Sequence, residues 1–366
     1  MGWEVVVVTP QSYTSPKEIE SFNNAQPFRI ISLEHLPSAP MKAIYRYRVI
    51  SGLIKKLRPQ IILASGDREV LLSAVLAKRF ELPWIAVEHG RIPPSWERPL
   101  KRWCFGQATA VVCVSRYTSE RLLKLGVRPR RMQVILNGAE LRGRHVASDS
   151  SPDDLREEFG PKGSRILLTV GSVTERKGQD VVISALPSII SRVRNTHYLI
   201  AGLPTRQHEF EGLAVKLGVS SHVHFLGQVD DDVLMRLYSC CDLFVMTSRH
   251  TIDEFEGFGI AVVEAALFSK PAIVSAQSGL VEAILDGVTG FGVPENDEVE
   301  TARKITLLLE DEELLQRMGK AAFEHARTEQ TWGRRVREYD ALLREVVQQG
   351  CAMSQAQSAA EKPETA

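Results

Sequence analysis

The sequence predicts two α/β units, each built on a parallel sheet with helices on both faces. Three observations support this prediction. Short β-branched runs alternate with helical patterns up to about Leu136, a polar stretch interrupts the alternation, and the same alternation restarts at Arg165. Several runs are apolar on both faces, as strands between two helical layers must be. Two such halves joined by a linker imply a cleft between them, where ligands of such sheets usually bind.

The first unit is expected over residues 1–140. Its strands are predicted at Glu4–Thr9, Phe28–Ser32, Gln60–Ala64, Trp84–Glu88, Ala110–Ser115 and Gln133–Leu136. Its helices are predicted at Lys42–Leu57, Arg68–Phe80, Arg98–Gln107 and Ser119–Leu125.

Residues 141–163 read as a linker, because serine, aspartate and proline cluster there, and a second unit follows over residues 164–330. Its strands are predicted at Arg165–Val170, His197–Ala201, His222–Leu226, Asp242–Thr247, Pro271–Ser275 and Gly290–Val293. Its helices are predicted at Gly178–Ser191, Glu209–Leu217, Asp231–Cys240, Gly259–Leu267, Val281–Leu285 and Glu298–Leu309.

The chain after Glu310 is expected to be helical to about Gln349. An apolar face at helical spacing predicts a last helix at about 331–347 that packs back on the first unit; it comprises Trp332, Val336, Tyr339, Leu342, Leu343 and Val346. Residues 350–366 carry little to bury, so we expect a disordered tail.

Composition excludes several classes of function. Lys and Arg number 45 and Asp and Glu number 45, so no net field recruits nucleic acid. The 5 cysteines are scattered without zinc spacing, which fits a reducing compartment. No run approaches the roughly 20 apolar residues that span a bilayer, and Met1 leads directly into a strand pattern rather than a signal peptide. We expect a soluble, cytoplasmic protein.

The segment EGFGIAVVE, Glu256 to Glu264, places two carboxylates around a two-glycine turn and the start of a helix. Glycines let backbone N–H groups approach a ligand closely, and the first N–H groups of a helix suit a phosphate. Glu256 then lies at the helix mouth, and Glu264 lies more than a turn inside and could reach a sugar or ribose hydroxyl. A capping acid followed by a solvated helix acid explains the same spacing equally well.

With both halves laid out, EGFGIAVVEA resembles the E-x7-E motif of retaining glycosyltransferases of the GT-B type, glycosyltransferase family four. Further similar segments are LLTVGSVTERKGQDVVISAL, HFLGQVDDDVLMRLYSCCDLFVMTS, VVCVSRYTSERL and QVILNGAE. The resemblance extends from Val5 to about Tyr339. It implies two Rossmann-like domains facing a cleft, and transfer of a hexose from a nucleoside-diphosphate sugar to a glycan or lipid-linked glycan hydroxyl with retention, without metal or cofactor.

The resemblance also implies roles for individual residues. Glu256 matches the acid that contacts the donor sugar, Lys177 the lysine that neutralises the leaving diphosphate, and His89 a histidine facing the sugar from the first domain. The backbone of Phe258, Gly259 and Ile260 lies where the family meets the diphosphate. Glu264 matches the acid that binds the donor ribose.

The sequence departs from the family pattern at two places. Many members have an arginine directly after the glycine that ends the second domain's first strand, whereas Ser172 follows Gly171 here. We therefore count Ser172 and Arg176 as donor-binding candidates, with Arg176 as a replacement cation.

The second departure is at the start of the chain. Members normally begin with a strand, a glycine-rich loop and a helix before a segment like Gly2–Val7. Either the chain starts late or its first domain is remodelled; we favour the former and expect the first domain to be N-terminally incomplete. Two alternatives to a transferase stay open: a nucleotide-sugar-binding remnant with impaired catalysis, and a GT-B sugar epimerase. A glycan phosphorylase is a further GT-B possibility, but no convincing lysine site for its pyridoxal phosphate is apparent.

Four other signals have structural explanations that we prefer. Asp230–Asp232 resembles an Asp-x-Asp metal motif but precedes a helix, so an N-cap explains it better. Asn137-Gly138 reads as a turn. The strand-flanking histidines His197, His222 and His224 read as satisfied core or edge residues.

The fourth signal is the basic amphipathic segment 41–58. It fits a helix packed on the sheet, and it also fits peripheral contact with an anionic membrane at the inner face; Lys101, Arg102 and Trp103 could extend such a surface towards a lipid-linked acceptor.

Overall fold

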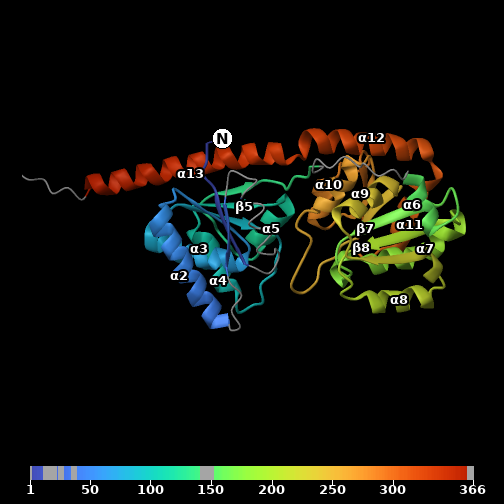
Figure 1. The fold of residues 1–366 in the computed structure, drawn as a ribbon, viewed down its shortest axis with the longest axis horizontal. Coiled ribbons are helices and arrows are strands. Elements are labelled where there is room, and N and C mark those ends of the chain that lie inside the picture. The colour runs from blue at the N-terminus through green and yellow to red at the C-terminus, as the bar shows by residue number, and fades with distance from the viewer. Residues whose placement is uncertain (1, 11–22, 24–28, 34–38, 141–151, 361–366) are drawn as a thin grey trace, which may run out of the picture.

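The computed structural model describes residues 2–10, 23, 29–33, 39–140 and 152–360. Figure 1 shows two α/β domains side by side, with the long C-terminal helix lying along the first of them. The predicted architecture of two Rossmann-like domains is confirmed.

The first domain contains two parallel sheets among its described strands. β1 (Val6–Pro10) pairs with β2 (Arg29–Leu33), and β3 (Ile62–Ser65), β4 (Trp84–Glu88), β5 (Ala110–Cys113) and β6 (Met132–Val134) pair in that order. The helices are α2 (Ala39–Leu57), α3 (Asp67–Phe80), α4 (Arg98–Gln107) and α5 (Arg116–Lys124). The expected incompleteness of this domain stays a prediction.

The second domain holds one six-stranded parallel sheet in the order β12-β11-β10-β7-β8-β9. The strands are β7 (Arg165–Val170), β8 (Thr196–Ala201), β9 (Val223–Gly227), β10 (Leu243–Met246), β11 (Ala272–Ser275) and β12 (Gly290–Val293). The helices are α7 (Gln179–Arg192), α8 (Gln207–Lys216), α9 (Asp231–Cys240), α10 (Ile260–Leu267), α11 (Glu298–Glu310) and α12 (Glu312–Glu329). This is the doubly wound order, whose direction of winding reverses between β7 and β10. Gly279–Ala283 forms a short 3₁₀ helix where we predicted an α-helix at Val281–Leu285.

The strands of the second sheet are apolar on both faces because each face is covered. Leu167 and Val245 belong to a cluster with helices α7, α8 and α11, whereas Ile166 and Met246 belong to a cluster with α9 and α10. The latter cluster also contains Val114 of the first domain. The apolar core is therefore continuous between the domains.

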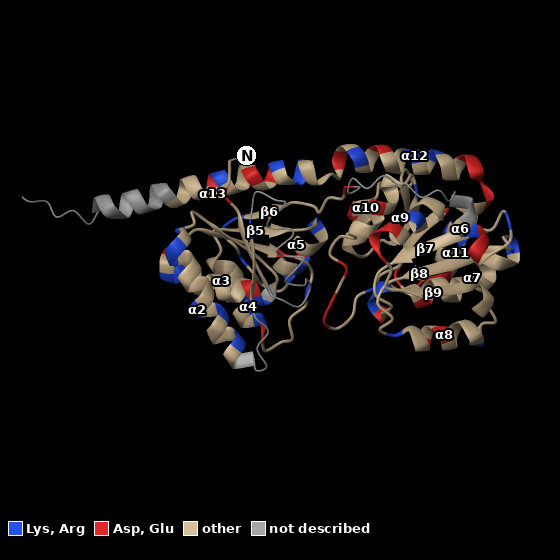
Figure 2. Ribbon diagram, viewed as in Figure 1, with Lys and Arg blue, Asp and Glu red and all other residues tan. Residues whose placement is uncertain are grey.

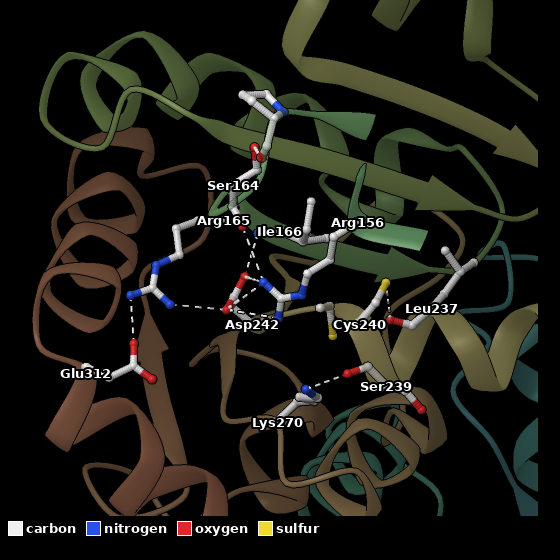
Figure 3. Close-up of polar contacts among 12 residues, drawn as sticks. Arg156, Ser164, Arg165, Ile166, Leu237, Ser239, Cys240, Asp242, Lys270 and Glu312 are labelled. Carbon is white, nitrogen blue, oxygen red and sulfur yellow. Dashed lines mark hydrogen bonds and ion pairs between the residues drawn. The ribbon is translucent and has the colours of Figure 1, made fainter. Parts of the chain in front are cut away.

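The expected linker is partly a helix. Residues 141–151 lie outside the described residues, but α6 (Pro152–Phe159) is helical, so a linker reaching 163 is wrong. Arg156 of α6 and Arg165 of β7 both donate to the buried carboxylate of Asp242, at 3.0 and 3.3 Å, and the backbone N–H of Ile166 donates to it at 2.7 Å (Figure 3). This network joins α6 to the second domain.

The last helix, α13 (Trp332–Ala360), packs on the first domain. Trp3 donates to Asp340 at 2.6 Å, Arg131 pairs with Glu345, and Leu342 and Val346 are fully buried. Two details of our prediction are wrong. Trp332 and Val336 are 38% and 43% exposed because the buried stripe begins at Arg335 and continues through Tyr339.

The second detail is the tail. Residues 351–360 continue α13, because they contain no glycine or proline and are rich in alanine and glutamine, and residues 361–366 lie outside the described part. Of the helices described, none combines the length and apolar composition that a membrane crossing requires. Burial raises the pKa of the Cys113 thiol to about 12, so this cysteine serves as a small apolar residue.

Three histidines form one cluster: His197 of β8, His224 of β9, and His222, which ends the 3₁₀ turn just before β9. His197 Nδ1 lies 3.1 Å from His224 Nε2, and the rings of His197 and His222 stack at 5.1 Å. Burial, followed by the charges of His224 and His222, lowers the pKa of His197 to about 4. Burial also lowers the pKa of His224.

This cluster predicts acid sensitivity of the fold. A histidine of the unfolded chain has a pKa near 6.5, so between about pH 6.5 and 4 the unfolded state binds a proton that His197 does not. The melting temperature should therefore fall as the pH drops through this window. His197→Gln should flatten the fall, measured by differential scanning calorimetry, and a change at the exposed His208 should leave it unchanged. Equal slopes for wild type and His197→Gln would contradict the assignment.

Candidate functional site

The candidate site lies where the second sheet reverses its winding. β7 and β10 are neighbours, and the segments that leave their carboxyl ends separate there, which is where ligands bind open α/β sheets. The turn after β7 contains Gly171 and leads into a 3₁₀ turn, Glu175–Lys177. A Cβ at Gly171 would lie 3.2 Å from Cε of Lys177, so the glycine lets this lysine fold back over the end of the strand.

The segment after β10 carries Glu256 and ends in α10. Gly259 precedes the helix with φ 111°, and a Cβ there would lie 2.3 Å from Leu280. No side chain accepts a hydrogen bond from the first N–H groups of α10, so these groups can donate to a ligand at the start of the helix. A Cβ at Gly257 would lie 2.0 Å from the carbonyl oxygen of His89, so glycine is needed for the two domains to approach.

Glu256 lies between two cations. Lys177 Nζ donates to its Oε2 at 2.7 Å, and Arg176 donates to the same oxygen. The side chains of Glu256 and Lys177 are each 14% exposed. Burial alone would raise the pKa of Glu256, but Lys177 and Arg176 outweigh it, and the pKa falls below its ordinary value. The carboxylate is therefore ionised at neutral pH, and both cations contact it.

The first domain contributes the turn after β4. His89 is exposed on this turn, with Nε2 2.8 Å from Ser65 Oγ. The turn hydrogen-bonds the segment that leads to Glu256, because Ile92 donates to the Asp253 carbonyl at 2.7 Å and Phe255 donates to the Gly90 carbonyl at 3.3 Å. His89 and Glu256 are thus held on opposite sides of one interdomain contact.

A second interdomain contact lies beside the first. Glu282 accepts hydrogen bonds from the N–H groups of Arg116 and Tyr117 at the start of α5, both at 2.9 Å. The Tyr117 hydroxyl bonds His250, which in turn contacts Glu295 at 2.6 Å.

A cavity of about 320 Å³ is lined by residues of both domains, and most of the predicted site residues are among them. Its lining includes His89, Lys177, Glu256 and the run 257–261, which contains Phe258, Gly259 and Ile260. Val114, Asn137 and Met246 also line it. The sequence indicates only a turn at Asn137, although its position just beyond the last strand of the first sheet is where a site residue is expected.

Three predicted donor-binding residues do not line the cavity: Ser172, Arg176 and Glu264. Arg176 nevertheless contacts Glu256, and Ser172 accepts a bond from Gln179 through its backbone carbonyl at 3.0 Å. Glu264 is half-buried on α10, where it accepts a hydrogen bond from the buried Tyr238 hydroxyl at 2.8 Å. The Tyr238 hydroxyl therefore orients the Glu264 carboxylate.

The N-cap interpretation of the aspartates is confirmed, because Asp230 accepts a hydrogen bond from the N–H of Val233 at 2.9 Å at the start of α9. Within the described ranges, no group of three or more His, Cys, Asp or Glu side chains is arranged to hold a metal ion. Lys101, expected on a basic surface, is instead buried against Glu88.

Comparison with known proteins agrees with this arrangement. Residues 1–142 match the family model described as Glycosyltransferase Family 4, and residues 151–325 match the one described as Glycosyl transferases group 1. A D-inositol 3-phosphate glycosyltransferase of Corynebacterium efficiens is 29% identical over 230 residues, which make up 61% of this chain and 53% of that protein. The chain thus spans about half the length of the curated relatives it matches.

Solved structures share the whole fold. A glycosyltransferase from Rickettsia africae aligns with a TM-score of 0.77 at 18% identity, covering 94% of this chain and 99% of the other. HepE from Anabaena, in complex with UDP, aligns with a TM-score of 0.76 at 19% identity, covering 93% and 99%. With both family models matched in order over most of its length, the chain belongs to the family 4 glycosyltransferases of the GT-B fold.

Proposed function

We propose that this chain transfers a hexose from a nucleoside-diphosphate sugar to a hydroxyl of a glycan or lipid-linked glycan, with retention at the anomeric carbon. One observation carries the proposal. Glu256, Lys177 and the start of α10 meet His89 of the other domain around a single cavity of about 320 Å³, a size that suits a small ligand.

The proposed chemistry places negative charge on the donor diphosphate. As the bond between the anomeric carbon and the diphosphate oxygen breaks, Lys177, Arg176 and the forward-facing N–H groups of α10 stabilise the charge that develops. The acceptor hydroxyl attacks from the face that the diphosphate leaves, and the donor phosphate takes its proton. These side chains and the helix start supply the countercharge, so the proposal needs no metal or cofactor.

The donor sugar lies between the two domains in this proposal. Glu256, ionised at neutral pH, accepts hydrogen bonds from sugar hydroxyls and stabilises positive charge at the anomeric carbon. His89 supports the sugar from the first domain. Glu264, oriented by Tyr238, binds the ribose, and Ser172 adds to donor binding.

A calorimetric panel of nucleotide sugars tests the function. One donor should bind, and its sugar should appear on an acceptor with the anomeric configuration unchanged by NMR. Binding without transfer would favour the remnant, and epimerisation without acceptor would favour the epimerase. Binding of none of the donors would reject all three.

Glu256→Ala should lower kcat by roughly 100-fold or more, the scale for losing one group that stabilises transition-state charge. Donor affinity should change far less, because Lys177 and Arg176 stay in place for the diphosphate. The check is kcat beside a calorimetric Kd. Glu254→Gln is the matched control, since Glu254 also pairs with Arg176 but is 59% exposed and lies outside the cavity lining. An unchanged kcat would remove Glu256 from the mechanism.

We also propose that α2 contacts an anionic membrane at the cytoplasmic face, where a lipid-linked acceptor would be presented. Figure 2 shows lysines and arginines along α2. The exposed apolar side chains Met41, Ile44 and Leu57 lie on the same helix, at 52%, 56% and 42% exposure. A basic helix with exposed apolar side chains favours such a surface.

Lys55→Glu/Lys56→Glu should weaken binding to vesicles of anionic lipid, because each lysine near the surface contributes about 1 kcal/mol. Co-sedimentation with the vesicles should show this weaker binding. Raising the salt concentration should weaken the binding of the wild type in the same way. Reversal at Arg317 of α12, which is 65% exposed, is the control. Equal binding to neutral and anionic vesicles would contradict the proposal.

A further inference from the structure

We propose that Glu88 and Lys101 form a positioning pair that fixes the turn carrying His89. The relevance of this pair to catalysis rests on the proposed function, whereas its effect on the His89 ring does not. The two residues come from the end of β4 and from α4. No motif in the sequence pointed to either of them as part of the site.

The pair is buried and close. Lys101 Nζ lies 2.6 Å from Glu88 Oε2, and the two side chains are 6% and 4% exposed. The ammonium also lies 5.3 Å from the centroid of the Phe105 ring. Burying two charges costs desolvation free energy, and their mutual attraction often does no more than offset that cost. An apolar pair of similar volume could therefore make the fold equally stable. Stability alone does not explain the pair.

Each member also binds the backbone beside His89. Glu88 Oε1 accepts the N–H of Gly90 at 2.9 Å, and Lys101 Nζ donates to the carbonyl of Arg91 at 3.0 Å. These bonds fix the chain immediately after His89, and the pairing of Glu88 with Cys113 fixes it immediately before. The turn therefore has little freedom to tilt the His89 ring.

The same turn is packed against the segment that carries Glu256. Gly90 has φ 126°, and a Cβ there would lie 3.1 Å from the Phe255 ring and 3.2 Å from its carbonyl oxygen. A shift of the turn would thus move His89. It would also disturb the contact with Phe255, the residue directly before Glu256. A displacement of about 1 Å can cost on the order of 100-fold in rate.

The experiment compares Lys101→Met with the double variant Glu88→Gln/Lys101→Met. The single variant leaves a buried carboxylate without its ammonium partner, so melting temperature and kcat should both fall. The double variant removes both charges and should regain most of the melting temperature. It still lacks the donor to the Arg91 carbonyl, so kcat should stay about 10- to 100-fold low with KM within about twofold. Recovery of both quantities would overturn the proposal.

Two controls separate positioning from folding. Asp242→Asn changes another buried ion network, remote from the cavity lining, and should lower the melting temperature while kcat is unchanged. In a His89→Ala background, Glu88→Gln/Lys101→Met should reduce kcat by a smaller factor than it does in the wild type, because His89 carries part of its effect. A full additional loss in that background would overturn the proposal.

A readout without turnover separates this inference from the proposed function. In a spectrum of ring-labelled histidines, the His89 signal is assigned by its absence in His89→Ala. It should move in Glu88→Gln/Lys101→Met and stay in place in Asp242→Asn. An unmoved signal would refute the positioning pair whatever the enzyme transfers. A wild type that turns over no donor, with the signal moving as expected, would refute only the proposed function.

Discussion

The carboxylate of Glu256, held between Lys177 and Arg176, is the interaction on which the site depends. It joins the segment after β10 to the turn after β7, at the point where the sheet reverses its winding. Without it two cations would face each other in a half-buried place, and without them a mostly buried carboxylate would favour its neutral form. The three charges stabilise one another, and Arg176 also pairs with the exposed Glu254 at 3.0 Å, so the cluster brings two cations and two carboxylates together.

Strand and helix positions were largely predictable because burial on both faces of a parallel strand leaves a distinct apolar run. Trp84–Glu88, Arg165–Val170 and Gly290–Val293 begin and end as predicted. The predictions fail where contacts with residues distant in the sequence determine the local structure. Pro152–Phe159 reads as polar linker, yet becomes helical because Arg156 reaches Asp242, a partner far along the chain. The buried stripe of α13 includes Arg335, which periodicity of apolar residues cannot find.

The site was predictable where chemistry requires particular residues in sequence. The run from Glu256 to Ile260 and Lys177 lie together as the motif implies. Asn137 and Met246 line the same cavity without a motif of their own, because their place follows from how two domains meet. For Lys101 the sequence pointed to the wrong environment. A basic residue near a tryptophan is typical of a surface, but the fold buries Lys101 beside Glu88.

The approach of the domains explains why so many glycines surround the site. At Gly257 the backbone of the second domain lies so close to the His89 carbonyl of the first that no side chain fits, with a Cβ only 2.0 Å away, and Gly279 meets the Gly257 carbonyl equally closely within the second domain. Such contacts are rigid, because backbone cannot move aside as a side chain can. Glu282 accepts hydrogen bonds from the first N–H groups of α5 across the same boundary. A cavity assembled from two domains therefore keeps a defined shape, since the backbone contacts between its halves tolerate little displacement.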